Sequence, residues 1–177
     1  MRMNSLQELY VDQLKDLHSA ENQLVQALPN MAKVATSPQL KEGFTMHLEQ
    51  TRTQVNRLDQ IFSRHGISVG SKKCEAMAGL VKEGEEAIKL EGNEHVRDAA
   101  LIAAAQRVEH YEIAGYGTVA SYARQLGHDA DVKLLEETLN EEATTDKKLT
   151  KLAEGGILSS GINDEAMASQ SSSRNSR

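Results

Sequence analysis

Apolar residues recur near the start of the chain at spacings of three and four, which is the period of one face of an α-helix. Ser5 and Glu8 have the spacing of a capping box, so we expect a helix to begin there. Pro29 lies late in this stripe and is expected to kink the helix or to end its regular part. The stripe consists of Leu6, Tyr10, Leu14, Leu17, Leu24, Leu28 and Met31.

A second stripe follows after a short interval. Ser37 and Pro38 are a favoured N-cap and first helical residue, and Gly66 is a natural stop signal. The pattern therefore predicts a second long helix, joined to the first by a short loop. Its apolar positions are Leu40, Phe44, Leu48, Val55, Leu58 and Phe62.

The next part of the chain predicts one short and two long helices. Residues 73–90 have the pattern of a short helix interrupted by glycines, and Asn93 can cap a long helix that runs to Gly127. The last long helix is expected to start at about Asp129 and to end at Gly155, followed by a second glycine. Its stripe consists of Val132, Leu135, Leu139, Leu149 and Leu152.

The connections between these helices predict an all-α fold. Two short loops make two antiparallel hairpins, and the long connection between them contains the short helix. This is the topology of a ferritin-like four-helix bundle with one long crossover, here containing a fifth helix. We expect residues 1–156 to form this bundle and residues 157–177, which are rich in serine, to be a disordered tail.

The composition and charge of the chain argue against several classes of function. A net charge of −6 argues against binding to nucleic acids or to anionic membranes. A single cysteine, Cys74, excludes an internal disulfide and fits a reducing compartment. The first residues contain no apolar run of the length found in signal peptides, and no segment has the apolar length of a membrane span. We therefore expect a soluble, cytoplasmic protein.

Acidic residues lie on the faces that should be apolar. Placing successive residues 100° apart puts these side chains inside the stripes of three of the four long helices. The third long helix has a broad face of small residues, which carries two of them together with Tyr116. The acidic residues are Glu21, Glu109, Glu112, Glu142 and Asp146.

These acidic residues lie at similar distances from the loops, measured along the helices. Glu112 lies 15 residues before Gly127 and Glu142 lies 15 residues after it, so an antiparallel hairpin brings the two carboxylates level. Glu21, 16 residues before Ser37, has a comparable depth in the other hairpin. An isolated acid of this kind commonly lies at the bundle edge or faces a partner subunit, but the agreement of face and depth favours one shared site.

Such a cluster needs a positive charge or protonation, because buried like charges repel and are costly to desolvate. We find no lysine or arginine on the stripes at that depth. A pair of divalent or trivalent metal ions is the simplest answer, and a carboxylate-rich set of ligands favours the hard metals iron, manganese or magnesium over zinc. Protonated or solvated acids are the alternative.

Five segments resemble the bacterial stress proteins of the YciF/YciE type over roughly residues 4 to 153. They are SAENQLVQALP, HLEQT, KCEAMAGL, RDAALIAAAQRVEHYEIAGYGT and LLEETLNEE. The resemblance implies a ferritin-like fold similar to rubrerythrin, a dinuclear metal centre, most simply of iron, and a homodimer. It does not specify a reaction.

The resemblance also implies ligand positions. Glu21 corresponds to the ligand of the first helix, Glu109 and Glu112 to the pair of the third, and Glu142 to the carboxylate of the fourth. Asp146 stands where a histidine often stands in related sites. The second helix departs from the pattern because it has no Glu-x-x-His: Gln54 is at the expected depth, and His47 faces inward about two turns nearer the loop.

Three functions follow from these expectations. The first is a di-metal oxidase or peroxidase that acts on O₂ or peroxide; it would need a separate electron donor, because the chain has no cysteine pairs. The second is metal sequestration. The third is a non-enzymatic helical interaction or scaffold dimer in which the acids are protonated.

Overall fold

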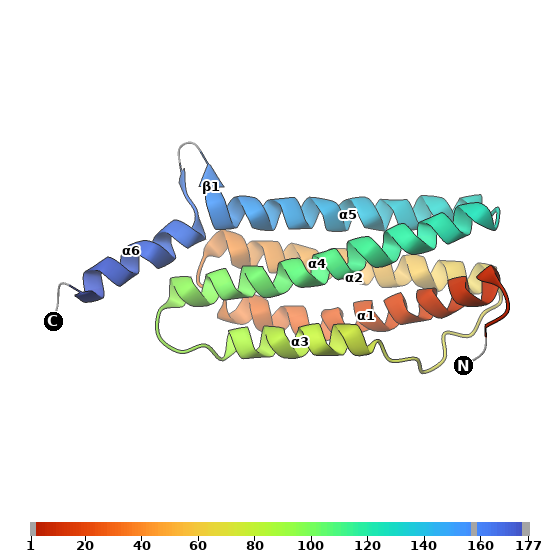
Figure 1. Cartoon of the computed structure of the whole chain (residues 1–177), viewed down its shortest axis with the longest axis horizontal. Helices are drawn as coiled ribbons and strands as arrows, with labels where there is room; N and C mark the ends of the chain where they lie inside the picture. The colour runs from red at the N-terminus through yellow and green to blue at the C-terminus, as the bar shows by residue number, and fades with distance from the viewer. Residues whose placement is uncertain (1–2, 157–158, 175–177) are drawn as a thin grey trace.

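The computed structural model of the chain describes residues 3–156 and 159–174. It confirms the all-α fold, with the four long helices side by side (Figure 1). The elements in chain order are α1 (Leu6–Val34), α2 (Pro38–Arg64), α3 (Glu75–Ile88), α4 (Glu94–Gln125), α5 (Asp129–Glu154), β1 (Gly155–Gly156), β2 (Ser159–Ser160) and α6 (Ile162–Arg174).

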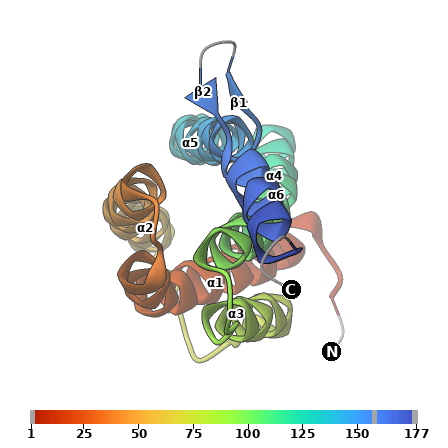
Figure 2. The same cartoon turned by 90° about the vertical axis from the view of Figure 1, so that its left-hand side faces the viewer.

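The two hairpins are the ones expected from loop length. α1 packs on α2, α4 packs on α5, and α3 lies in the long connection and covers the outside of α1 and α4. Seen end-on, the four long helices surround a common interior and α3 lies outside it (Figure 2). α1 does not end at Pro29 but continues to Val34.

The tail differs from the expectation of disorder. Residues 162–174 form α6, which packs against α4 and α5, and Ile162 is buried in the core. The sequence did not indicate this helix because its composition is serine-rich, and its buried Ile162 stands at its start rather than within a long apolar stripe. Residues 157–158 and 175–177 of the predicted tail lie outside the described residues.

Two local contacts fix the helices that carry the acids. The buried carboxylate of Asp98 on α4 accepts hydrogen bonds from the backbone N–H groups of Thr36, at 3.0 and 3.1 Å, and of Ser37, at 2.7 Å. This attaches the α1–α2 turn to α4. A Cβ atom on Gly115 would lie 2.7 Å from Leu17 Cδ2, so glycine permits the close approach of α4 to α1.

The apolar core is divided into two halves along the bundle. One half contains Leu24, Phe44, Leu101 and Leu149, and the other contains Tyr10, Leu14, Leu58, Phe62 and Leu135. On every long helix, polar residues separate the two halves. Within the described residues, no helix combines the length and apolar character needed to cross a bilayer.

Candidate metal centre

The segment between the two apolar halves is a buried polar layer. It is formed by Glu21 of α1, His47, Thr51 and Gln54 of α2, Glu109, Glu112 and Tyr116 of α4, and Glu142 of α5. All eight side chains are at most 4% exposed. Each takes a position that the helical period assigns to the core, so the fold itself removes these groups from water.

Four residues of the polar layer converge on one point. One ligand atom from each of His47, Glu109, Glu112 and Glu142 lies within 4.8 Å of the others. His47 Nε2 is 3.3 Å from Glu109 Oε1 and 3.9 Å from Glu142 Oε2. Three carboxylates and one imidazole from three helices therefore face a common centre.

Glu21 lies beside this group and is held by Tyr116. The Tyr116 hydroxyl donates a hydrogen bond to Glu21 Oε1, and both side chains are fully buried. Tyr116 combines this contact with packing in the core, because its ring lies in the apolar half while its hydroxyl reaches the polar layer.

Gln54 connects the layer to a cation at its edge. Its amide Nε2 donates to Glu142 Oε1 and, at 3.1 Å, to Glu141 Oε2. Glu141 in turn accepts two hydrogen bonds from Arg57, at 2.6 and 2.8 Å. The expectation that no arginine lies at this depth is therefore incomplete, since Arg57 is buried one turn from Gln54, but its charge is matched by Glu141 and Glu137 rather than by the converging acids.

The buried surroundings of the polar layer disfavour the ionised form of its carboxyl groups. Burial, followed by repulsion from neighbouring carboxylates such as Glu142, raises the pKa of Glu21 and Glu112 well above 4.5. Burial and a hydrogen-bond contact with Glu142 do the same to the pKa of Glu109. Burial lowers the pKa of His47 from 6.5, which favours the neutral imidazole, the form in which one ring nitrogen has a free lone pair.

Many polar atoms in the layer have no hydrogen-bond partner. They include both carboxylate oxygens of Glu112, both ring nitrogens of His47, and one oxygen each of Glu21, Gln54, Glu109 and Glu142. Buried polar groups are normally satisfied, because each orphaned group costs about 1–3 kcal/mol. The donor set therefore fits a bound cation with oxygen and imidazole ligands.

Asp146 and His47 lie differently from the sequence expectation. Asp146 is outside the converging group: its Oδ1 accepts from Gln106 Nε2 at 3.0 Å and lies 3.5 Å from His110 Nε2. His47 is inside the group although it was placed about two turns away. Counting residues gives the depth of the backbone but ignores the length of the side chains. The Glu142 carboxylate is long enough to contact both His47 and Gln54, although these two residues lie about two turns apart on α2.

A small cavity leads to the group from the surface. It measures about 50 Å³ and lies between α2 and α5. Exposed Met46 and Lys148 line its outer end, and buried His47 and Glu109 line its inner end. A space of this size can hold a water-sized molecule, since about 10–15 Å³ of such volume is enough for one water.

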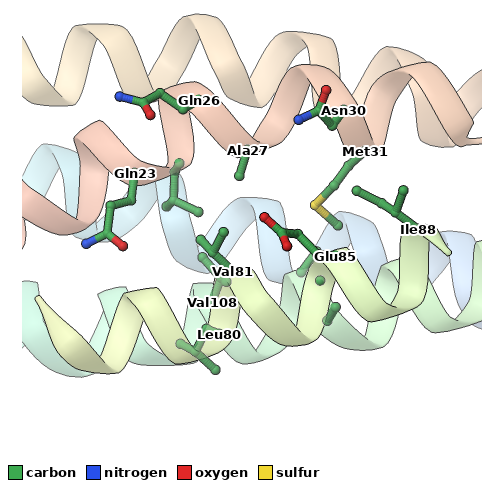
Figure 3. Close-up of a pocket in the computed structure, with 14 residues that line it drawn as sticks. Gln23, Gln26, Ala27, Asn30, Met31, Leu80, Val81, Glu85, Ile88 and Val108 are labelled. Carbon is green, nitrogen blue, oxygen red and sulfur yellow. The ribbon is translucent and has the colours of Figure 1, made fainter.

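A larger groove does not reach the acids. It measures about 330 Å³, lies between α1 and α3, and has an apolar floor that includes Met31, Val81, Ile88 and Val108 (Figure 3). None of the converging residues lines it. Within the described residues, the cavity between α2 and α5 is one that reaches the candidate centre.

The family described as Domain of unknown function (DUF892) matches residues 5–166. The chain belongs to this family. It is 47% identical to Protein YciF of Escherichia coli over 154 residues, which cover 86% of this chain and 93% of that protein.

Solved structures agree with this assignment. The crystal structure of the Escherichia coli stress protein YciF matches with a TM-score of 0.82 and 46% identity, covering 85% of this chain and 95% of that one. YcfI from Rhodopseudomonas palustris matches with a TM-score of 0.81 and 43% identity, covering 85% and 96%. A protein from Xanthomonas campestris shares the fold alone, at a TM-score of 0.69 and 18% identity over 98% of this chain and all of that one.

Proposed function

We propose that the polar layer binds a pair of iron or manganese ions and that the loaded protein reacts with O₂ or peroxide. The observation that carries this proposal is the set of buried, unpartnered oxygen and nitrogen atoms on the four long helices, four residues of which converge on one point. His47, Glu109, Glu112 and Glu142 would hold one ion. Glu21 and Gln54, beside them, offer donors for a second.

The protein side chains have defined tasks in this proposal. A bound pair of these metals would supply electrons to O₂ or peroxide. Tyr116 holds Glu21 by its hydrogen bond, and Gln54 does the same for Glu142, so both carboxylates keep their orientation. The two apolar halves of the core exclude bulk water from the layer, which strengthens every electrostatic interaction in it.

The partners, the location and the type of activity of the protein are also part of the proposal. An electron donor separate from this chain, a homodimer and a cytoplasmic location stay predictions. The proposal favours turnover over sequestration because the cavity beside His47 has room for a reactant next to the ligands.

The cavity offers a direct test. A Cβ on Gly43 would meet no atom within 4 Å, so Gly43→Leu should fold and add bulk at the lining of the cavity. We expect this variant to bind the same amount of metal and to consume peroxide several-fold more slowly. Gly79→Leu, a substitution at an equally open glycine of α3 away from the cavity, is the control.

The outcome separates the candidate functions. Slower consumption in Gly43→Leu and unchanged consumption in Gly79→Leu support catalysis through the α2–α5 cavity. Stoichiometric metal uptake with no peroxide or O₂ consumption would instead support sequestration. A protein without metal uptake would support the helical interaction module.

A further inference from the structure

A second group of potential metal ligands lies at the far end of the bundle. It combines His65, the C-cap of α2, with His128 and Asp131 at the start of α5. One ligand atom from each of the three lies within 4.8 Å of the others. Asp131 and Glu142 are separated by 11 residues of α5, so this end group is about 16 Å from the polar layer along the helix.

The contacts within the end group are close. His65 Nε2 lies 2.5 Å from Asp131 Oδ2, and the His65 and His128 rings have centroids 4.6 Å apart. Asp131 is fully buried, and the two histidines are partly buried. The group therefore opens to solvent on its imidazole side, where an ion can enter.

Neighbouring residues orient these ligands. The Tyr10 hydroxyl donates to Asp131 Oδ2 at 3.0 Å, which fixes the carboxylate. Gln7 Oε1 accepts from His128 Nε2 at 2.9 Å, which places the proton on that nitrogen and leaves Nδ1 as the basic one. Outer contacts of this kind are typical of imidazole and carboxylate metal ligands.

We propose that His65, His128 and Asp131 form a binding site for one divalent transition-metal ion of the Zn²⁺ class, with a solvent molecule as the fourth ligand. Two imidazoles and one carboxylate are a donor set that Zn²⁺ takes in proteins with one position left open. A tetrahedral ion with bonds of about 2.0–2.1 Å would need its ligand atoms roughly 3.3 Å apart. His65, at a helix end, has to withdraw by less than about 1 Å for this.

Arg64 competes with a metal ion for the Asp131 carboxylate. Its guanidinium makes an ion pair with Asp131 Oδ1, and its side chain is 42% exposed. It can therefore move into solvent when an ion binds, but its positive charge opposes binding. Removing that charge should strengthen metal binding, whereas a purely structural ion-pair cluster would give no such effect.

The test uses the full chain in a background that silences the polar layer, Glu112→Gln/Glu142→Gln. Co²⁺ is the probe, since its visible spectrum reports coordination, and Zn²⁺ should displace it. We expect saturable binding of about one Co²⁺ per chain, weakened at least tenfold by His65→Gln or His128→Gln. His95→Gln, which removes a partly exposed histidine of α4 that pairs with Glu165, should leave binding unchanged.

Arg64→Gln provides the opposite test. In the same background it should bind Co²⁺ several-fold more tightly. Absence of saturable Co²⁺ binding would overturn the proposal. Co²⁺ binding that neither histidine substitution weakens would overturn it as well. Because the polar layer is silenced, neither result depends on the function proposed for it.

Discussion

Glu112 shows most clearly what the polar layer costs the metal-free chain. Both of its carboxylate oxygens are buried without a hydrogen-bond partner, and three other carboxylates lie near it. Burial raises its pKa well above 4.5, so the folded metal-free chain must protonate this group or keep a repelled charge. A residue of this kind opposes folding unless a cation balances it.

The residue-scale prediction is that Glu112→Gln stabilises the metal-free protein. Glutamine has nearly the same shape and no charge to desolvate, so the free energy of unfolding at about pH 8 should rise by roughly 1–3 kcal/mol. Urea unfolding of chelator-treated protein measures this. The control is Glu49→Gln, at an exposed site of α2, which should change the free energy of unfolding little. A Glu112→Gln protein that is less stable than the unaltered one would contradict this prediction.

At the scale of the elements, the sequence predicted the long helices well because each has an amphipathic stripe and recognisable end signals. It failed for α6, whose composition resembles a disordered tail. The polar layer was found because buried acids interrupt the stripes. The end group was missed because His65, His128 and Asp131 lie at helix ends in separate segments, where periodicity gives no information about which residues meet.

The contact of α6 with the bundle is testable through Ile162. Its side chain is 5% exposed and belongs to the core half that contains Phe44 and Leu149. Ile162→Ala should lower the free energy of unfolding by about 2–3 kcal/mol, because it leaves a cavity in a packed core.

The matched control is Met167→Ala in the same helix, where the side chain is 70% exposed. Met167→Ala should leave stability nearly unchanged. Equal, small effects of both substitutions in urea unfolding would mean that α6 does not pack as described.

At the scale of the whole molecule, the polar layer predicts how stability depends on pH. The pKa values of Glu21, Glu109 and Glu112 are raised by burial from 4.5, so the folded metal-free chain binds more protons than the unfolded chain above that pH. Stability must then fall as pH rises. His47, with its pKa lowered from 6.5 by burial, gives the opposite slope, which fades within about one pH unit above 6.5.

Above pH 6.5 the contribution of His47 declines, so the carboxyl groups dominate the slope there. Metal-free protein should lose stability between about pH 6.5 and 8.5, by up to about 1.4 kcal/mol per pH unit for each carboxyl group. With Mn²⁺ present, the stabilisation should grow over the same interval, since the ligands must be deprotonated to bind. Urea unfolding with and without Mn²⁺ measures both curves; a flat or rising metal-free curve would contradict the prediction.

Metal binding by the chelator-treated protein shows whether the polar layer is a metal site. Calorimetric titration with Mn²⁺ or, without oxygen, Fe²⁺ should be run beside the Glu112→Gln/Glu142→Gln variant. The unaltered chain should bind about one to two ions tightly, and the variant should lose them. Absence of binding in the unaltered chain, or equal binding by the variant, would contradict it.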